Sequence, residues 1–252
     1  MNPPTYTDSL ARWIALIEQL SPPFQRLVAS IVDRPEVGSN LLTAPSSCKG
    51  HHCHQGGNLE HTVEVSELAL TIAEELDAPV DRDVLLVAAL LHDIGKCGEY
   101  EIGSDRTRMS QQGRLVGHKM VGYELVTSAL RTSEGITETQ QLGLRNCFIA
   151  SEGNSSDRRG QATLEGFIVS RADQLSAHLD LFRKSQHQMP AANGLGVRHE
   201  HMRETPFHIK PKTGQSTTPA HPSSSKAPQT AMERLRAAAK SQPKRDNRPG
   251  AR

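Results

Sequence analysis

The stretch LLVAALLHDIGKCGEY, residues 85–100, decides the fold. Its first seven residues, Leu85–Leu91, are uniformly apolar, and His92 and Asp93 follow directly. Leucine and alanine outnumber β-branched residues in this run, which favours a helix over a strand. A helix that is apolar all round is predicted to be buried on every side. The chain therefore carries a buried helix straight into a histidine and an aspartate.

Ionisable side chains at the end of a buried helix need a partner. Burying them is costly unless they are paired or bound to a metal. A neutral imidazole and a carboxylate together suit Zn, Mn, Fe or Mg. His92 and Asp93 are therefore candidate metal ligands, although the pair taken alone favours a His–Asp hydrogen bond in the core.

Two distant segments add groups of the same kind. GGNLEHTVEV, residues 56–65, places His61 early on a predicted helix. SRADQLSA, residues 170–177, places Asp173 inside an otherwise apolar helical stretch, where a lone aspartate also fits a solvent-facing position. The set of a histidine, a His–Asp pair and an aspartate, each on a helix, is more specific than any one member.

Helical patterns cover most of the chain up to about residue 185. Apolar spacing predicts two helices between Thr7 and Asp33, broken at Ser21–Pro23, and a long helix from about Leu59 to Leu76. Three more helices are predicted in GHKMVGYELVTSALR (117–131), TQQLGLRNCFIASEG (139–153) and TLEGFIVSRADQLSAHLDLFR (163–183). Residues 100–115 are polar and contain glycines, which predicts a loop with a short hairpin.

Local signals predict the ends and faces of these helices. Asp81 or Asp83 is predicted to cap the start of the central apolar helix, and Gly95 to cap its end. Three positions of the helix that starts near residue 117 are predicted to face the core: Met120, Leu125 and Ala129.

Composition and charge divide the chain into a body and a tail. Of 252 residues, 36% are hydrophobic and 4% aromatic, which suffices for one core but not for a core of the whole length. Residues 186–252 hold twelve Lys and Arg against four Asp and Glu, which leaves 17 basic and 24 acidic residues elsewhere. This low-complexity tail is predicted to be disordered. A basic tail suits a nucleic acid or another anionic partner, and equally a tail that only aids solubility.

These patterns predict three regions and a compartment. We expect an N-terminal helical extension over residues 1–40, a helical domain over 41–185 and the tail over 186–252. No run of eighteen apolar residues predicts a transmembrane helix, and the first ten residues lack the pattern of a signal peptide. Four cysteines in a chain of this length indicate reduced thiols rather than a disulfide framework. We therefore expect a cytoplasmic protein that does not enter a membrane.

Four motifs between residues 47 and 181 resemble the HD-domain metal-dependent phosphohydrolases. In chain order they are HHCHQGGNLEHT, ALLHDIGK, GRLVGH and RADQLSA. The GRLVGH segment after the His–Asp helix is most similar to the HD domain of bacterial 3′–5′ exoribonucleases. The block LLTAPSSCKGHHCHQGGNLEHTVEV, residues 41–65, also resembles the HD-type relaxase domain of conjugative elements. The resemblance implies an all-α, HD-domain helical bundle.

The resemblance also implies a centre for one or two divalent metal ions, with Mn, Mg, Fe, Zn and Ni all open. Four positions match the ligands of the first metal: His61, His92, Asp93 and Asp173. Asp93 would bridge to a second ion, and His118 matches a ligand of that second site. Glu152 stands where the exoribonucleases carry a histidine, in ASEG instead of Ser-His-His-Gly. A glutamate there favours a harder ion or weakens the second site.

Further residues are candidates for catalysis and substrate binding. Lys96 matches a lysine near the phosphate in the resembled family, with an exposed lysine at a helix end as the alternative. The alternative for His118 is a solvent-facing residue at the start of its helix. His51 and His52 belong to a motif that lies beside the metal in the resembled families, and with Arg114 of GRLVGH they are candidate substrate contacts. A zinc site made from this histidine cluster and nearby cysteines fits no standard spacing.

The resemblance implies an enzyme. Water activated by the metal would attack a phosphodiester or phosphoester of a nucleic acid or nucleotide, in the manner of a 3′–5′ exonuclease, with Asp93 and Lys96 as catalytic residues. Two alternatives stay open. One is a relaxase-like DNA-processing protein of a conjugative element. The other is a degenerate HD module that binds nucleic acid or a partner without catalysis, which the changed segment around Glu152 motivates.

Overall fold

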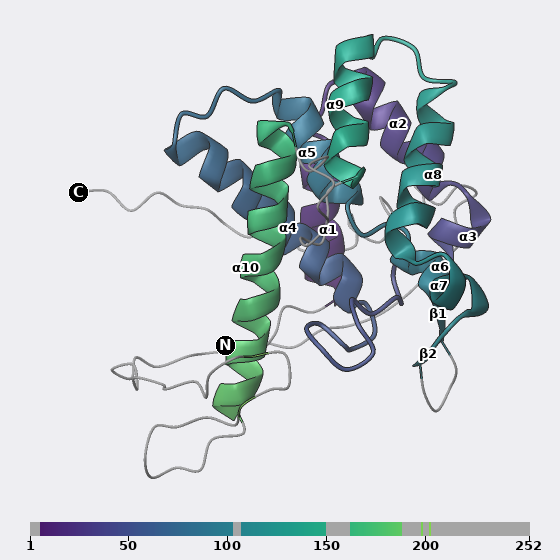
Figure 1. Cartoon of the computed structure of the whole chain (residues 1–252), viewed down its shortest axis with the longest axis vertical. Coiled ribbons are helices and arrows are strands. Elements are labelled where there is room, and N and C mark those ends of the chain that lie inside the picture. Colours follow the sequence, from purple (N-terminus) through teal and green to yellow (C-terminus); the bar gives the residue numbers. More distant parts are fainter. Residues whose placement is uncertain (1–5, 103–106, 150–161, 188–197, 199–201, 203–252) are drawn as a thin grey trace.

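The computed structural model describes residues 6–102, 107–149, 162–187, 198 and 202, and these form a helical bundle (Figure 1). The helices are α1 (Tyr6–Ile17), α2 (Pro22–Val32), α3 (Pro35–Gly38), α4 (Gly57–Glu75), α5 (Arg82–Leu91), α6 (Lys96–Glu99), α7 (Gln111–Leu115), α8 (His118–Leu130), α9 (Glu138–Ile149) and α10 (Leu164–His187). The strands β1 (Tyr100–Ile102) and β2 (Thr107–Met109) pair antiparallel. The predicted all-α class and the short hairpin are confirmed, and the single turn of α7 was not foreseen.

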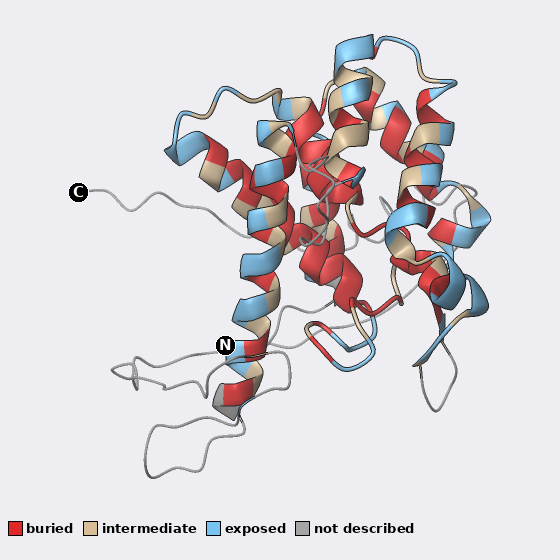
Figure 2. Ribbon diagram, in the orientation of Figure 1, coloured by how far each residue is buried: buried red, intermediate tan, exposed pale blue. Residues whose placement is uncertain are grey.

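Helix α5 lies at the centre of the core. Every residue from Val84 to Leu91 is buried, as the uniformly apolar run predicted. Helices α4, α9 and α10 pack around α5, and Figure 2 shows the buried residues gathered in the middle of the bundle. Fully burying each large aliphatic side chain contributes about 1.5–3 kcal/mol. The buried helix therefore fixes the position of the polar residues that follow it.

The start of α5 is fixed by two neighbouring aspartates. Asp81 is the N-cap, and its Oδ1 accepts a hydrogen bond of 3.0 Å from the backbone N–H of Val84. Asp83 instead accepts a hydrogen bond of 3.0 Å from the N–H of Ser21, the N-cap residue of α2. Of the two predicted capping residues, Asp81 therefore caps this helix and Asp83 ties it to α2.

The two N-terminal helices belong to the same hydrophobic core. Trp13 of α1 is fully buried and Phe24 of α2 is 2% exposed, and both join one cluster with α4 and α5. Helix α1 packs on α4, and the Arg12 guanidinium donates to Glu67 of α4 across this interface. The predicted boundaries at residues 40 and 185 stay predictions, and nearly all of the tail over 186–252 lies outside the described residues.

The predicted role of Gly95 as a helix C-cap is wrong. Helix α5 ends at Leu91 with His92 in the capping position, and Gly95 has an ordinary helical conformation at the start of α6. A Cβ at Gly95 would lie 2.0 Å from the carbonyl oxygen of His118. The glycine is needed because α6 and the start of α8 approach each other closely, and the sequence carries no local sign of that contact.

The predicted inward face of α8 is partly wrong. Leu125 and Ala129 are buried as expected, but Met120 is 52% exposed. Val121 takes the first place in the buried row, because it lies four residues before Leu125 and eight before Ala129. The prediction is therefore wrong only in the first turn of α8, where Val121 and not Met120 faces the core. None of the described helices is long and apolar enough to cross a membrane.

Replacing Gly95 with alanine tests the contact between α6 and α8. The new Cβ would also lie 2.8 Å from the backbone nitrogen of Gly122, so the backbone has to shift. Overpacking of this kind costs about 1–3 kcal/mol, and we expect a loss of that size in the free energy of unfolding measured with urea.

Gly122→Ala is the matched control for this substitution. Its Cβ meets nothing closer than 3.6 Å, and alanine favours a helix interior by about 1 kcal/mol. We expect this variant to be neutral or stabilised. Equal unfolding midpoints for the two variants would show that the close approach does not constrain the fold.

Candidate metal centre

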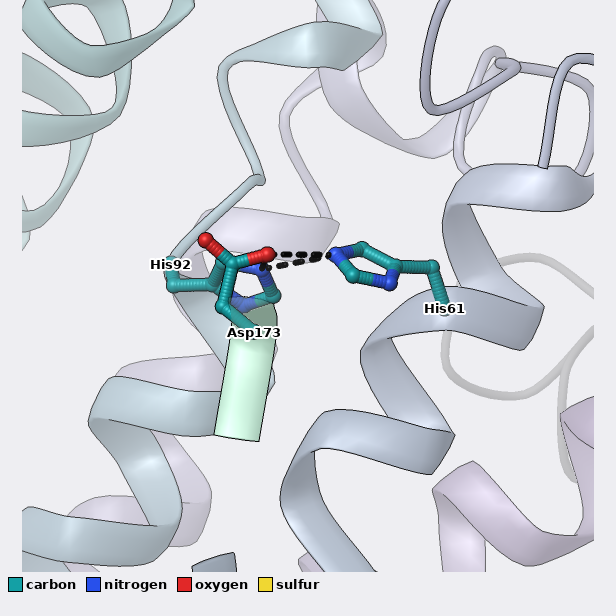
Figure 3. A group of neighbouring side chains, drawn as sticks. All are labelled: His61, His92 and Asp173. Carbon is teal, nitrogen blue, oxygen red and sulfur yellow. Dashed lines mark hydrogen bonds and ion pairs between the residues drawn. The ribbon is translucent and has the colours of Figure 1, made fainter. Parts of the chain in front are cut away.

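Three of the predicted ligands point at one another from three separate helices. His61 comes from α4, His92 follows the last residue of α5, and Asp173 comes from α10 (Figure 3). His61 Nε2 lies 3.0 Å from Asp173 Oδ1 and 3.4 Å from His92 Nε2. His92 Nε2 lies 4.0 Å from Asp173 Oδ1. The fold thus brings together residues that are as many as 112 positions apart.

Asp93 completes the group. Its Oδ2 lies 3.3 Å from His92 Nε2 and 3.6 Å from His61 Nε2. Two ligand atoms that are each about 2.1 Å from one ion are about 3.0 Å apart at a right angle and about 3.4 Å apart at a tetrahedral angle. The separations around His61 and His92 fall close to this range. A single His–Asp hydrogen bond explains one contact, whereas each of the two histidines lies within 4.0 Å of both carboxylates.

The outer nitrogens of the two histidine rings set their tautomers. His92 Nδ1 is 2.8 Å from the carbonyl oxygen of Ala89, and His61 Nδ1 is 3.0 Å from Ser176 Oγ. A carbonyl oxygen only accepts, so Nδ1 of His92 carries the hydrogen and its Nε2 offers a lone pair. Lone pairs and carboxylates aimed at one point repel each other unless a cation lies between them. The donor set therefore fits a divalent ion.

Burial and the neighbouring carboxylates act in opposite directions on the pKa values of the two histidines. Burial lowers the pKa of His61, which keeps its imidazole in the neutral, metal-binding form. Burial would also lower the pKa of His92, but the carboxylates of Asp93 and Asp173 outweigh it and raise that pKa. The two carboxylates thus favour positive charge at this point.

Asp93 has a different partner on each oxygen. Lys96 Nζ donates to Oδ2 at 2.6 Å, and His118 Nε2 lies 3.4 Å from Oδ1. Burial would raise the pKa of Asp93, but Lys96, His92 and His118 outweigh it and hold that pKa well below its usual range. The carboxylate is therefore ionised and faces two sides, as the bridging position inferred from the resemblance requires.

The two alternatives for Lys96 and His118 fail on burial and contacts. Lys96 is 6% exposed and is not a free lysine at a helix end. The His118 side chain is 24% exposed, and its Nδ1 lies 2.9 Å from Oε1 of the buried Glu99. A carboxylate behind a histidine is a common way to orient a metal ligand. Glu99 was missed in the sequence, where its only sign is an acidic residue between the buried Cys97 and Tyr100.

The loop that contains His51 and His52 lies against the centre. The His51 ring centroid is 4.8 Å from that of His61, and the His52 centroid is 5.2 Å from it. Burial lowers the pKa of His51 to about 3, so this ring is neutral at pH 7. Its Nε2 is buried and has no hydrogen-bond partner among the described residues. His51 is therefore positioned beside the ligands with one ring nitrogen uncommitted.

Helix α10 holds this loop in place. Asp180 Oδ2 accepts a hydrogen bond of 2.8 Å from the backbone N–H of His52, and Lys184 Nζ donates to the carbonyl oxygen of Gly50 at 2.7 Å. His52 itself has a positive φ of 42°, and a Cβ at Gly57 would lie 2.1 Å from its carbonyl oxygen. The loop therefore follows a strained, closely packed path that depends on α10.

A second group of possible ligand atoms lies next to this loop. His52, Glu60 and Glu64 bring one ligand atom each within 4.8 Å of the others. Glu60 already pairs with His54 at 2.7 Å, and Glu64 is engaged by Ser176. The four cysteines are free, and none belongs to a potential metal group in the described part of the chain. A zinc site that uses cysteines next to this loop therefore gains no support from the geometry.

The remaining predicted residues are less informative. Glu152 lies outside the described residues, so its role as a ligand stays a prediction. Arg114 is exposed on α7, four residues before His118, and its role in substrate binding also stays a prediction. Burial raises the pKa of Cys97 to about 12, which leaves this thiol protonated and unsuited to act as a nucleophile.

A helical bundle that brings His61, the His92–Asp93 pair and Asp173 together has the arrangement of a protein that binds a metal ion between its helices. Comparison with known proteins supports this assignment. Residues 58–178 match the family model described as HD domain, and this segment contains all six predicted ligands. This segment of the chain is therefore identified as an HD domain.

Two curated relatives match more than half of the chain. The chain is 26% identical over 182 residues to the 3′-5′ exoribonuclease YhaM of Bacillus subtilis, which covers 71% of this chain and 55% of the relative. It is 38% identical over 149 residues to the dihydroneopterin 2′,3′-cyclic phosphate phosphodiesterase of Methanocaldococcus jannaschii, which covers 58% of this chain and 56% of the relative. The chain thus spans about half the length of these relatives. No solved structure gives a significant match.

Removing and restoring a divalent ion tests the centre directly. We expect Mn²⁺ to raise the melting temperature of chelator-treated protein, because an ion that binds only the folded state stabilises it by about 2.7 kcal/mol at 100 times its Kd. Asp173→Ala should abolish most of this increase, measured by calorimetry.

Glu74→Ala is the control, since Glu74 is an exposed carboxylate on α4 that pairs with Arg82 at 3.5 Å. Its response to Mn²⁺ should equal that of the wild type. An undiminished response in Asp173→Ala would exclude Asp173 as a ligand.

Proposed function

We propose that this chain is a metal-dependent phosphohydrolase that cleaves a phosphodiester or phosphoester of a nucleic acid or nucleotide. The observation that carries the proposal is the convergence of two imidazoles and two carboxylates at the end of α5, with a buried lysine beside them. A divalent ion bound there would lower the pKa of a bound water and supply hydroxide near neutral pH. This chemistry needs no serine or cysteine nucleophile.

The residues around the ion have separate tasks in this proposal. His61, His92 and Asp173 would hold the first ion, together with the carboxylate of Asp93. One oxygen of that carboxylate, Oδ1, lies 3.4 Å from His118 Nε2, so Asp93 and His118 could together contribute to a second ion site. The number of ions and the contribution of Glu152 to the second site belong to the proposal.

Lys96 is suited to stabilise charge on the substrate. Its ammonium group is buried and pairs with Asp93 at 2.6 Å, so it is fixed next to the ligands. A fixed positive charge in a poorly solvated site stabilises the negative charge that develops on a phosphoryl group. His51, with an uncommitted Nε2 beside His61, is the best-placed candidate for contact with the substrate.

The substrate class follows from the relatives together with the charge of the chain. One relative is named an exoribonuclease and the other a cyclic phosphate phosphodiesterase, and both names denote phosphodiester cleavage. Residues 186–252 carry twelve basic and four acidic residues, and we propose that they add salt-dependent, non-specific affinity for a nucleic acid. The four free cysteines suit the reducing cytoplasm, which is the compartment we propose.

Turnover of defined substrates tests the proposal. Chelator-treated protein reloaded with Mn²⁺ or Mg²⁺ should hydrolyse at least one of single-stranded RNA, single-stranded DNA or a 2′,3′-cyclic nucleotide. Asp93→Asn should lower kcat by at least about 100-fold, because it removes a ligand and the partner of Lys96. Lys96→Met should lower kcat while metal content stays the same.

The control and the alternatives are read from the same assay. Glu74→Gln removes an exposed carboxylate on α4 and should leave turnover unchanged. Metal-loaded protein that turns over none of these substrates would contradict the proposal and favour a binding module without catalysis. Nicking of a supercoiled plasmid that carries a transfer origin, without hydrolysis of the other substrates, would favour the relaxase-like alternative.

A further inference from the structure

A chain of hydrogen bonds leads away from the metal centre through the back of His61. His61 Nδ1 lies 3.0 Å from Ser176 Oγ, and Ser176 Oγ lies 2.8 Å from Glu64 Oε2. The three residues come from two helices, with His61 and Glu64 on α4 and Ser176 on α10. Each of the three brings a polar group into the interior, which an apolar side chain of similar size would avoid.

The direction of these hydrogen bonds follows from the charge of Glu64. Burial would raise the pKa of Glu64, but the nearby His52 imidazole and hydrogen bonds from Ser176 and Arg183 outweigh it and lower that pKa to about 2. An ionised carboxylate only accepts, so the Ser176 hydroxyl donates to it. The Ser176 oxygen then accepts from Nδ1–H of His61. The proton of the His61 ring is thereby kept on Nδ1, and Nε2 offers its lone pair to the centre.

The spacing along both helices supports a built arrangement. On α4, Glu64 lies three residues after His61, and on α10, Ser176 lies three residues after Asp173. Residues three apart share one face of a helix. Where α4 packs on α10, the two candidate ligands therefore meet each other and the two supporting residues meet each other. The same helix contact sets both layers.

The outer end of this chain is also fixed. Arg183 Nη1 donates to Glu64 Oε1 at 3.0 Å, and His52 Nε2 lies 3.5 Å from Glu64 Oε2. Arg183 is 56% exposed, so its ion pair contributes little free energy by itself. Ser176 and His61 are both fully buried, so their hydrogen bond is shielded from competing water. Arg183 thus orients the Glu64 carboxylate from the surface, and the buried hydrogen bond with His61 fixes Ser176 in the interior.

We propose that Ser176 and Glu64 are positioning residues that hold His61 in its metal-binding tautomer and orientation, and thereby set the affinity of the centre for its ion. Neither residue touches the ion or the substrate. Removing such a supporting partner typically weakens metal binding 10- to 100-fold. This inference rests on the proposed metal-dependent function, but its test measures metal binding and not turnover. The competing explanation is that the serine serves only the packing of α4 on α10.

Metal affinity in matched variants separates the two explanations. The Kd for Mn²⁺ is measured by titration calorimetry on the full chain after chelator treatment. Ser176→Ala should weaken binding about 10- to 100-fold. Ser66→Ala is the control, since Ser66 is also fully buried and its hydroxyl donates to the carbonyl oxygen of Thr62 within α4. Its Kd should stay within about twofold of the wild type.

A double-mutant cycle tests whether Glu64 acts through Ser176. Glu64→Gln keeps the size of the side chain but removes its charge, and it should weaken binding in the same direction. If the carboxylate acts through the serine, the double variant should bind as weakly as Ser176→Ala alone, because coupled residues are not additive. Glu64→Gln also carries the test if Ser176→Ala does not fold. The melting temperature of each metal-free variant reports any loss of packing.

Three outcomes would overturn this inference. The first is a Kd for Ser176→Ala equal to that of Ser66→Ala, and the second is full additivity in the cycle. The third is a wild-type chain that binds no divalent ion, which would overturn the metal centre as well. A chain that binds Mn²⁺, loses affinity in Ser176→Ala and turns over no substrate would contradict only the proposed function.

Discussion

The negative charge of Asp93 is the constraint on which the rest of this structure depends. It sits at the end of the most apolar helix of the chain and is only 5% exposed. An uncompensated charge in such a place is strongly destabilising, by about 3–5 kcal/mol when one partner of a buried pair is removed. Lys96 and His118 lie against its two oxygens, and His92 precedes it. The polar interior of the bundle is organised to satisfy this one carboxylate.

The other candidate ligands reach Asp93 from helices that are distant in sequence. His61 arrives on α4 and Asp173 on α10, and both helices pack on α5. The ligand distances are therefore set by the same contacts that bury the leucines of the core. Because close-packed interiors resist small displacements, the centre is held by rigid elements. Packing and site geometry are thus two consequences of one arrangement.

A second layer of polar residues orients the first. The Ala89 carbonyl fixes His92, Glu99 stands behind His118, and Ser176 with Glu64 stands behind His61. His61, His92 and His118 therefore each have the outer nitrogen engaged, which leaves the inner one for a metal ion. A layer of this kind supports the proposed metal centre, because a chance meeting of polar side chains would lack it. It also explains why the interior contains buried serine and glutamate residues that the family resemblance did not single out.

The sequence by itself determined the helical class, the buried helix over residues 85–91 and the residue types suited to a metal, because apolar periodicity and ligand chemistry are local properties. It did not reveal the close approach at Gly95, the burial of Lys96, or the parts played by Glu99, Ser176 and Glu64. A polar residue has no periodic signature that says whether it faces water or a ligand. That choice was made only in the tertiary structure, where the packing of α10 on α4 places a serine behind a histidine 115 residues away.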